Sequence, residues 1–274
     1  MNITIPERTQ YQMDSGHEPK DGAVLWSEEH ELTNSKGILK EVYMKGYGWI
    51  QVFEPNGVSN GSIKDIRTRS NLPRDFINIR WSDFKWSYYG ENMQHSNQFR
   101  LAQSIITENE RYRREGFGVY IQSRTTGNGK TMLACVIANE LIERYGITVK
   151  FVTQAEYFRM MRSTDQEERK QAKAMRNATI LILDDIGASP CSTPWQQETM
   201  FNLISERYKE GYLTIYTSNL PPDELELDKG GRCFDRLVGK TIGLQLPDVP
   251  IRRNKAIEDR KKMEADFFGA KKNN

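Results

Sequence analysis

A glycine-containing loop between a predicted strand and a predicted helix constrains this chain more than any other feature of its sequence. Residues 118–122 read GVYIQ, a short run typical of a buried strand, and SRTTGNGKT follows at 123–131. An apolar stripe then runs from Leu133 to a helix-ending glycine, Gly146. A loop of this composition at a strand-to-helix junction directs backbone N–H groups and a helix N-terminus at a polyphosphate.

The loop supplies a set of candidate nucleotide-binding residues. They are Gly127, Asn128, Gly129, Lys130 and Thr131. Lys130 is suited to neutralise the β and γ phosphates, and the Thr131 hydroxyl is suited to ligate Mg²⁺. The first glycine of the GxxxxGK[ST] pattern is replaced by Arg124, so the turn leaving the strand must accommodate a side chain. A glycine turn that merely joins strand to helix is the alternative, and the context favours phosphate binding.

Two adjacent acids follow the most apolar run of the chain. Residues 180–187 read ILILDDIG, which places Asp184 and Asp185 just beyond a strand that suits burial on both faces of a parallel sheet. One carboxylate can hold Mg²⁺, and the next can polarise the attacking water. An ordinary turn is the alternative, and the upstream loop favours the paired acids. Asp185 stands where many P-loop ATPases carry Glu, so we expect slow hydrolysis.

Two further motifs lie downstream. YTSN ends a predicted strand, where the Asn219 amide can reach the γ-phosphate or the attacking water. A turn-forming asparagine is the alternative, and the residue alone leaves both open. GRCFDRL places Arg232 and Arg236 four residues apart on a short predicted helix. An exposed arginine suits the phosphate of a neighbouring subunit, although ordinary surface arginines also have this spacing.

The alternation of strands and helices predicts an α/β fold with a parallel, doubly wound sheet. We expect strands at 118–122, 148–152, 179–183, 213–217 and 241–246. We expect helices at 97–108, 154–161, 165–176 and 194–210, in addition to the one that ends at Gly146. Thr193 is the predicted N-cap of the last of these, with proline at its first position.

The region before the predicted sheet divides into two parts. Residues 1–72 are polar and rich in turn formers, and an alternating stretch at 40–53 predicts a hairpin. We interpret this region as a small module or a partly ordered arm. Residues 74–96 are dense in Trp, Phe and Tyr with little periodicity, so we expect them to pack against a neighbouring element.

Composition excludes several classes of protein. Lys and Arg number 39 against 37 Asp and Glu, a net charge of +2, so any contact with DNA must be local. Cys135, Cys191 and Cys233 are widely spaced and odd in number, which argues against a disulfide framework or a zinc module. No stretch approaches the roughly 18 apolar residues that span a bilayer, and the N-terminus has no apolar core region. We therefore expect a cytoplasmic protein without a membrane partner.

In the order GNGKT, LILDDIG, TSN and GRCFDRL, the motifs resemble those of the AAA+ helicase loaders of the DnaC and DnaI type and the related IstB-like transposition helper ATPases. The resemblance covers roughly residues 73–255, and the ordered set is more specific than any one motif. It implies an AAA+ P-loop NTPase fold with a Walker A loop at 127–131 and a Walker B pair at Asp184 and Asp185.

The resemblance also implies roles for residues outside the two Walker motifs. It implies sensor 1 at Asn219 and an arginine finger at Arg236, with Arg232 one helical turn before it. PDVPIRRNKA resembles the place where loaders present a sensor 2 arginine, which implies this role for Arg252 and makes Arg253 its neighbour. The implied cofactors are ATP and Mg²⁺, with Thr131 and Asp184 toward the metal and Asp185, Asn219 and Arg236 toward catalysis.

The function implied by the resemblance is loading of a replicative DNA helicase onto DNA, by an ATPase that forms a homo-oligomer when ATP is bound. The implied organisation is a partner-binding module at 1–72, an AAA+ domain at 73–255 and a basic tail at 256–274. The module lacks the Cys and His cluster of some loaders. An IstB-like transposition helper is one alternative, and a nucleotide-binding interaction module with little hydrolysis is another.

Two segments are rich in basic residues. The resemblance places 157–176 near single-stranded DNA, although its alternating charges are also typical of a solvated helix face. The run at 252–272 is basic as well, and we interpret it as an unstructured tail in preference to a nucleic-acid contact.

Overall fold

The computed structural model describes residues 23–32, 35–44, 48–55, 60–225 and 231–269. By its internal contacts the chain divides into two compact units, Met1–Asn56 and Gly57–Asn274. The helix α1 (Asn60–Thr68), which falls within the predicted N-terminal module, belongs to the second unit. The functional division at residues 72 and 255 stays a prediction.

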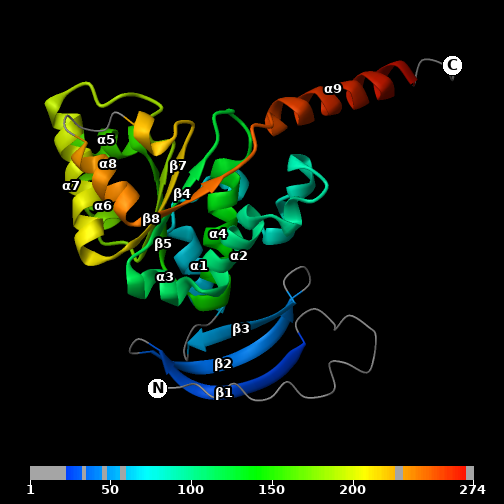
Figure 1. Cartoon of the computed structure of the whole chain (residues 1–274), viewed down its shortest axis with the longest axis horizontal. Coiled ribbons are helices and arrows are strands. Elements are labelled where there is room, and N and C mark those ends of the chain that lie inside the picture. The colour runs from blue at the N-terminus through cyan, green and yellow to red at the C-terminus, as the bar shows by residue number, and fades with distance from the viewer. Residues whose placement is uncertain (1–22, 33–34, 45–47, 56–59, 226–230, 270–274) are drawn as a thin grey trace. The chain divides into compact units, whose positions relative to one another are not determined.

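The first unit holds an antiparallel sheet of three strands in the order β1-β2-β3 (Figure 1). The strands are β1 (Val24–Leu32), β2 (Ser35–Met44) and β3 (Gly48–Pro55). The predicted hairpin at 40–53 is confirmed as the pairing of β2 with β3, in which Val42 lies opposite Ile50. The sequence reading missed β1, whose register with β2 shifts between Val24 and Trp26.

The second unit is built on a parallel sheet of five strands in the order β5-β6-β7-β4-β8 (Figure 1). The strands are β4 (Gly118–Gln122), β5 (Val149–Thr153), β6 (Ile180–Asp184), β7 (Leu213–Ser218) and β8 (Thr241–Gln245). All five agree with the predicted strands to within a residue or two. The predicted α/β class with an AAA+ type of parallel sheet is confirmed.

Helices cover both faces of this sheet (Figure 1). The helices that follow α1 are α2 (Asn97–Thr107), α3 (Asn109–Glu115), α4 (Lys130–Tyr145), α5 (Gln154–Arg162), α6 (Gln166–Arg176), α7 (Pro194–Glu210) and α8 (Arg232–Gly239). α1 and α2 pack on α4, whereas α5, α6, α7 and α8 share a buried core on the opposite face that includes Tyr157, Met175, Leu203 and Leu237. The short helix α3 was not predicted.

Local signals explain where the main helices begin and end. α4 follows Gly129 and ends at Gly146, and both glycines adopt positive φ, 99° and 60°. Thr193 caps α7 reciprocally with Gln196, and Pro194 occupies the first helical position. These boundaries depend on residues within one turn of each end, which is why the sequence predicts them.

The aromatic segment before α2 forms four short 3₁₀ helices. They are η2 (Arg74–Phe76), η3 (Trp81–Asp83), η4 (Trp86–Tyr89) and η5 (Met93–His95). Trp81, Phe84, Trp86 and Tyr89 are buried, and both tryptophan rings meet the ring of Phe99 on α2 edge-on. The expectation that this segment packs against a neighbouring element is confirmed.

A buried arginine ties three elements of the second unit together. Arg207 on α7 donates hydrogen bonds to the backbone oxygens of Met175, Ala178 and Leu213 at 2.8–3.0 Å and to the hydroxyl of Thr214 at 2.8 Å. Burial lowers the pKa of Arg207 to about 10. The side chain thereby satisfies carbonyls where α6 ends and β7 begins.

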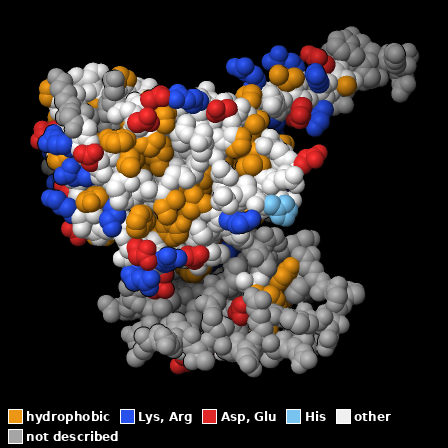
Figure 2. Space-filling view, viewed as in Figure 1, with side chains coloured by type: hydrophobic (Ala, Val, Ile, Leu, Met, Phe, Trp, Pro, Cys, Tyr) orange, Lys and Arg blue, Asp and Glu red, His pale blue; other side chains and the backbone are white. Residues whose placement is uncertain are grey.

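The C-terminal run is a helix, which corrects the expectation of an unstructured tail. α9 extends over Ile251–Gly269, and the side chains of 252–265 are exposed. Figure 2 shows Lys and Arg side chains next to Asp and Glu along it. The run contains many good helix formers and neither proline nor an internal glycine before Gly269, a signal that its charge obscured.

The remaining expectations from composition concern cysteines and membranes. Cys135, Cys191 and Cys233 are buried and free of disulfides. Over the described ranges, we find no cluster of three or more potential metal ligands from His, Cys, Asp and Glu. No helix within those ranges is both long enough and apolar enough to cross a membrane.

Candidate functional site

The loop that leaves β4 needs glycine at two positions. Gly127 and Gly129 have φ values of 72° and 99°, a region that side chains rarely adopt. A Cβ atom on Gly129 would lie 2.7 Å from the Tyr89 hydroxyl oxygen, and one on Gly127 would lie 2.9 Å from the Cβ atom of Arg252. Tight packing therefore reinforces the backbone requirement at both positions.

The ammonium of Lys130 is held by the loop itself. Its Nζ donates to the carbonyl oxygens of Ser123 and Thr125 at 3.1 and 2.9 Å, and to Asn128 Oδ1 at 3.1 Å. Burial lowers the pKa of Lys130, an effect that Asp185, Asp184 and Asp248 oppose. The loop thus encloses a cation, and phosphate oxygens can replace the loop oxygens as acceptors for its N–H groups.

Asp184, at the carboxyl end of β6, is bracketed by two hydroxyl groups. Its Oδ2 accepts from Thr131 Oγ1 at 3.2 Å, and its Oδ1 accepts from Thr217 Oγ1 at 2.6 Å. Burial raises the pKa of Asp184, and the hydrogen bonds from Thr217 and Thr131 counteract part of that rise. A carboxylate beside a threonine hydroxyl is a hard oxygen donor set, which fits Mg²⁺.

The next acid has an unusual backbone conformation. Asp185 lies in the left-handed region, with φ of 57°, and its side chain is exposed. Its N–H donates to Thr217 Oγ1 at 2.9 Å, so one hydroxyl contacts both acids. Left-handed residues other than glycine are uncommon and gather at functional sites.

Asn219 follows β7, which pairs with β6 in the sheet. Its Oδ1 atom is buried and has no hydrogen-bond partner among the described residues. The turn at this point is supported by Ser218, whose Oγ accepts from the N–H of Leu220 at 3.0 Å. A buried amide oxygen without a partner is costly, and a bound water or ligand can satisfy it.

Arg124, the departure from the glycine pattern, is accommodated without strain. The φ of Arg124 is not positive, so a residue with any side chain can adopt its backbone conformation. Its Nη1 donates to Glu224 Oε2 at 3.1 Å, and both side chains are largely exposed. The turn that leaves β4 therefore accommodates the Arg124 side chain, as the replacement of the first glycine requires.

The structure brings one of the predicted arginines to the loop. The N–H of Arg252, at the start of α9, donates to the carbonyl of Gly127 at 2.9 Å, and its side chain is exposed. Its neighbour Arg253 is exposed on α9. The described contacts of Arg236 lie instead on α7 and α8, where its guanidinium and that of Arg232 stack on Phe201 at 4.6 and 4.3 Å.

Sequence reasoning missed several residues that shape the site. Asp248 accepts from Ser123 Oγ at 2.7 Å and from the N–H of Thr125 at 3.1 Å, and the Ser123 bond is the main reason that the pKa of Asp248 is lowered. Thr217 contacts both acids. Asp248 lies in the motif PDVPIRRNKA, which was noted for Arg252, and Thr217 lies in YTSN, which was noted for Asn219. Tyr89 lies in the aromatic segment before α2.

The parallel sheet and the glycine loop that leaves β4 define a P-loop NTPase fold of the AAA+ type. Residues 119–229 match the model of the family described as IstB-like ATP binding protein. The resemblance to IstB-like proteins and to loaders of the DnaC and DnaI type, predicted from the order of the motifs, is therefore confirmed.

Individual relatives agree with this assignment. The replicative helicase loader DnaI of Bacillus subtilis (strain 168) is 30% identical over 115 residues, which cover 41% of this chain and 36% of that protein. The curated relatives are matched over only 36% to 39% of their length.

Solved structures share the fold. A putative primosome component from Streptococcus pyogenes serotype M3 has a TM-score of 0.54 and 22% identity, covering 69% of this chain and 97% of that one. The DnaC helicase loader has a TM-score of 0.53 and 22% identity, covering 64% of this chain and 99% of the other.

Proposed function

We propose that this chain is an ATP-dependent loader of a replicative DNA helicase onto DNA in replication initiation. The observation that carries the proposal is the junction of Lys130, Thr131 and Asp184 at the carboxyl edge of the sheet, in a domain similar to a helicase loader. ATP is the proposed switch between the helicase-bound and released states.

Each residue of the site has a proposed part in nucleotide chemistry. Gly127, Asn128, Gly129 and Lys130 bind the phosphates, and Thr131 and Asp184 hold Mg²⁺, which supplies charge neutralisation at the β and γ phosphates. Asp185 orients and polarises the attacking water, and Asn219 turns its unpaired amide oxygen toward that water. Arg252 contacts the nucleotide from the start of α9.

We assign the arginine finger to Arg236, acting on the site of a neighbouring copy. Its described contacts are on α7 and α8, away from the loop of its own chain, which supports action in trans. A guanidinium is the side chain best suited to charge that develops on a transferred phosphoryl group. In this proposal the chain forms a homo-oligomer when ATP is bound. It hydrolyses ATP slowly until that oligomer has assembled.

The proposed partners are the helicase, contacted through residues 1–72, and single-stranded DNA, in the cytoplasm. Helices α5 and α6 carry the Arg and Lys side chains of the segment 157–176, which the resemblance places near DNA. Several are paired within the chain, for example Arg159 with Glu168 at 2.6 Å, so DNA would compete with ion pairs that are exposed and therefore weak. Such binding would weaken steeply with salt.

A pulldown with purified replicative helicase tests the proposal. Tagged wild type and Lys130→Ala are compared with ATP and Mg²⁺, and Lys209→Ala, an exposed cation on α7, is the matched control. We expect wild type and Lys209→Ala to retain the helicase and Lys130→Ala to release it. Helicase binding that does not depend on nucleotide in any variant would favour an interaction module with little hydrolysis.

The IstB-like transposition helper makes a different prediction for the same protein. Such a helper would assemble on duplex DNA with a transposase, without any helicase. Stable filaments on duplex DNA, together with no capture of the helicase, would therefore favour the helper over the loader. The assignment of the nucleotide site would be unchanged.

A further inference from the structure

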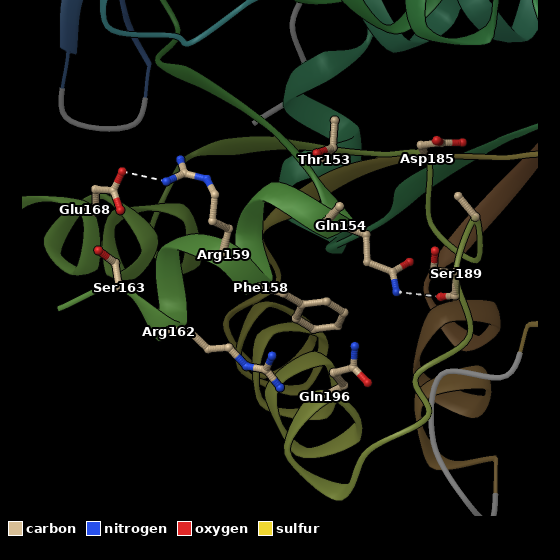
Figure 3. Close-up of a pocket in the computed structure, with 12 residues that line it drawn as sticks. Thr153, Gln154, Phe158, Arg159, Arg162, Ser163, Glu168, Asp185, Ser189 and Gln196 are labelled. Carbon is tan, nitrogen blue, oxygen red and sulfur yellow. Dashed lines mark hydrogen bonds and ion pairs between the residues drawn. The ribbon is translucent and has the colours of Figure 1, made fainter. Parts of the chain in front are cut away.

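The segment that follows the two acids forms one wall of a large cavity beside the site. This cavity of about 720 Å³ is lined by residues of α5 and α6, by Asp185 and by the segment that leads to α7 (Figure 3). The same segment, residues 185–191, carries the acid that we assign to activation of water. Its conformation therefore decides where that carboxylate lies.

A single side chain of α5 holds this segment. Gln154 is only 3% exposed, and its Oε1 accepts from the N–H of Gly187 at 2.7 Å. Its Nε2 donates to the carbonyl of Ser189 at 3.2 Å (Figure 3). The same Nε2 donates to Cys191 Sγ at 3.4 Å. Because a buried amide is costly to leave unpaired, movement of the segment away from α5 is opposed at several points.

The opposite side of the segment is fixed by β7. Thr217 Oγ1 accepts from the N–H of Asp185 at 2.9 Å, and Ser218 Oγ donates to the carbonyl of Ile186 at 2.7 Å. Gly187 has φ of 77°, and a Cβ atom there would lie 2.5 Å from Leu225 Cδ2. The left-handed Asp185 is thus held between β7 on one side and Gln154 on the other.

We propose that Gln154 is a positioning residue for ATP hydrolysis, which fixes the segment from which Asp185 reaches the attacking water. The inference rests on the proposed ATPase function and adds a residue outside the Walker, sensor and finger motifs. Because Gln154 is the first residue of α5, a displacement of α5 reaches Asp185 through this amide.

The first test separates turnover from nucleotide affinity. Gln154→Leu removes both amide atoms with little change of volume, and we expect turnover to fall by about 10-fold or more because displaced catalytic groups lose rate steeply. The Kd for ATP should stay within about twofold, because no phosphate-binding residue is altered. The control is Gln196→Leu, since Gln196 lines the same cavity but bonds to Thr193.

The second test uses pH to restore the missing donor. A neutral glutamic acid at 154 can accept from Gly187 and donate to Ser189, whereas its ionised form cannot donate. For Gln154→Glu, the turnover relative to wild type at the same pH should therefore rise as the pH falls from about 8 to about 6, because burial raises a carboxyl pKa. The charged groups that line the same cavity are the carboxylates of Asp185 and Glu168 and the guanidiniums of Arg159 and Arg162, and the thiol of Cys191 contacts position 154 directly. The two negative and two positive charges balance.

Either of two results would overturn the inference. One is a turnover loss in Gln154→Leu no larger than in Gln196→Leu, and the other is a Gln154→Glu ratio that does not change with pH. A wild type that hydrolyses no ATP, even when assembled with helicase and DNA, would instead overturn the proposed ATPase activity itself.

Discussion

The hydroxyl of Tyr89 donates a hydrogen bond to the backbone carbonyl of Asn128, thirty-nine residues further along the chain. The aromatic segment before the sheet is therefore part of the wall of the phosphate loop. Phe84 lies stacked beside Tyr89, and its ring is also the near neighbour of a Cβ built on Gly129.

Removing that hydroxyl tests how much the loop depends on the aromatic segment. Tyr89→Phe leaves the carbonyl of Asn128 without its phenol donor, and we expect the free energy of unfolding to fall by about 1–2 kcal/mol. ATP affinity should fall severalfold as the loop loosens. Urea unfolding and nucleotide titration measure the two effects, and Tyr88→Phe, at a side chain 52% exposed, should change neither.

Asp184→Asn should stabilise the nucleotide-free protein near pH 7. Burial raises the pKa of Asp184 in the folded state. The neutral carboxyl therefore stabilises the folded protein at a pH below its unfolded-state pKa, and this stabilisation is lost as the pH rises through the folded-state pKa. The melting temperature of the variant should exceed that of wild type at neutral pH, and the difference should shrink as the pH falls toward about 4, the usual pKa of an exposed Asp. The exposed carboxylate in Asp223→Asn serves as control, and a difference that is constant with pH would contradict the assignment.

Arg236→Ala should leave ATP affinity unchanged and lower hydrolysis by about 10³-fold only in the assembled form. The matched control is Arg232→Ala, which stacks on the same Phe201 ring one turn away. Mixing Arg236→Ala with Lys130→Ala subunits should restore part of the activity, since the second variant supplies Arg236 to the intact site of the first. Absence of rescue in stable mixed oligomers would exclude a finger in trans.

Arg124→Gly restores the glycine pattern, and we expect it to change the Kd for ATP by less than about threefold. The backbone at 124 is already unstrained, and the ion pair with Glu224 is exposed to solvent, so its contribution is small. Isothermal titration of both proteins with ATP measures the effect. Tenfold tighter binding by the glycine variant would show that the arginine side chain itself obstructs the nucleotide.

Local patterns predicted most of the AAA+ domain. The five strands, the capping box at Thr193 and the glycine end of α4 each depend on neighbouring residues, which the sequence displays directly. The carboxyl ends of parallel strands meet at one edge, which is why Lys130 and Asp184 were predicted to share a site. Their hydrogen-bonded link through Thr131 agrees with that expectation.

Contacts between distant segments could not be predicted in this way. The hydrogen bond from Ser123 to Asp248 joins residues 125 positions apart, and no periodicity or cap signals it. The clamp of Gln154 on Gly187 depends on how α5 meets the loop after β6. Arg236 raises a different difficulty, because the site proposed for it belongs to another copy of the chain.

α9 begins on the phosphate loop, through the bond from the Arg252 N–H to the Gly127 carbonyl, and continues as an exposed helix of 19 residues. At 1.5 Å per residue such a helix is about 28 Å long. A tilt of about 10° at its first turn would therefore carry its far end by about 5 Å. The length of α9 would thus convert a small adjustment at the phosphate loop into a displacement of about one helical turn at the other end of the helix.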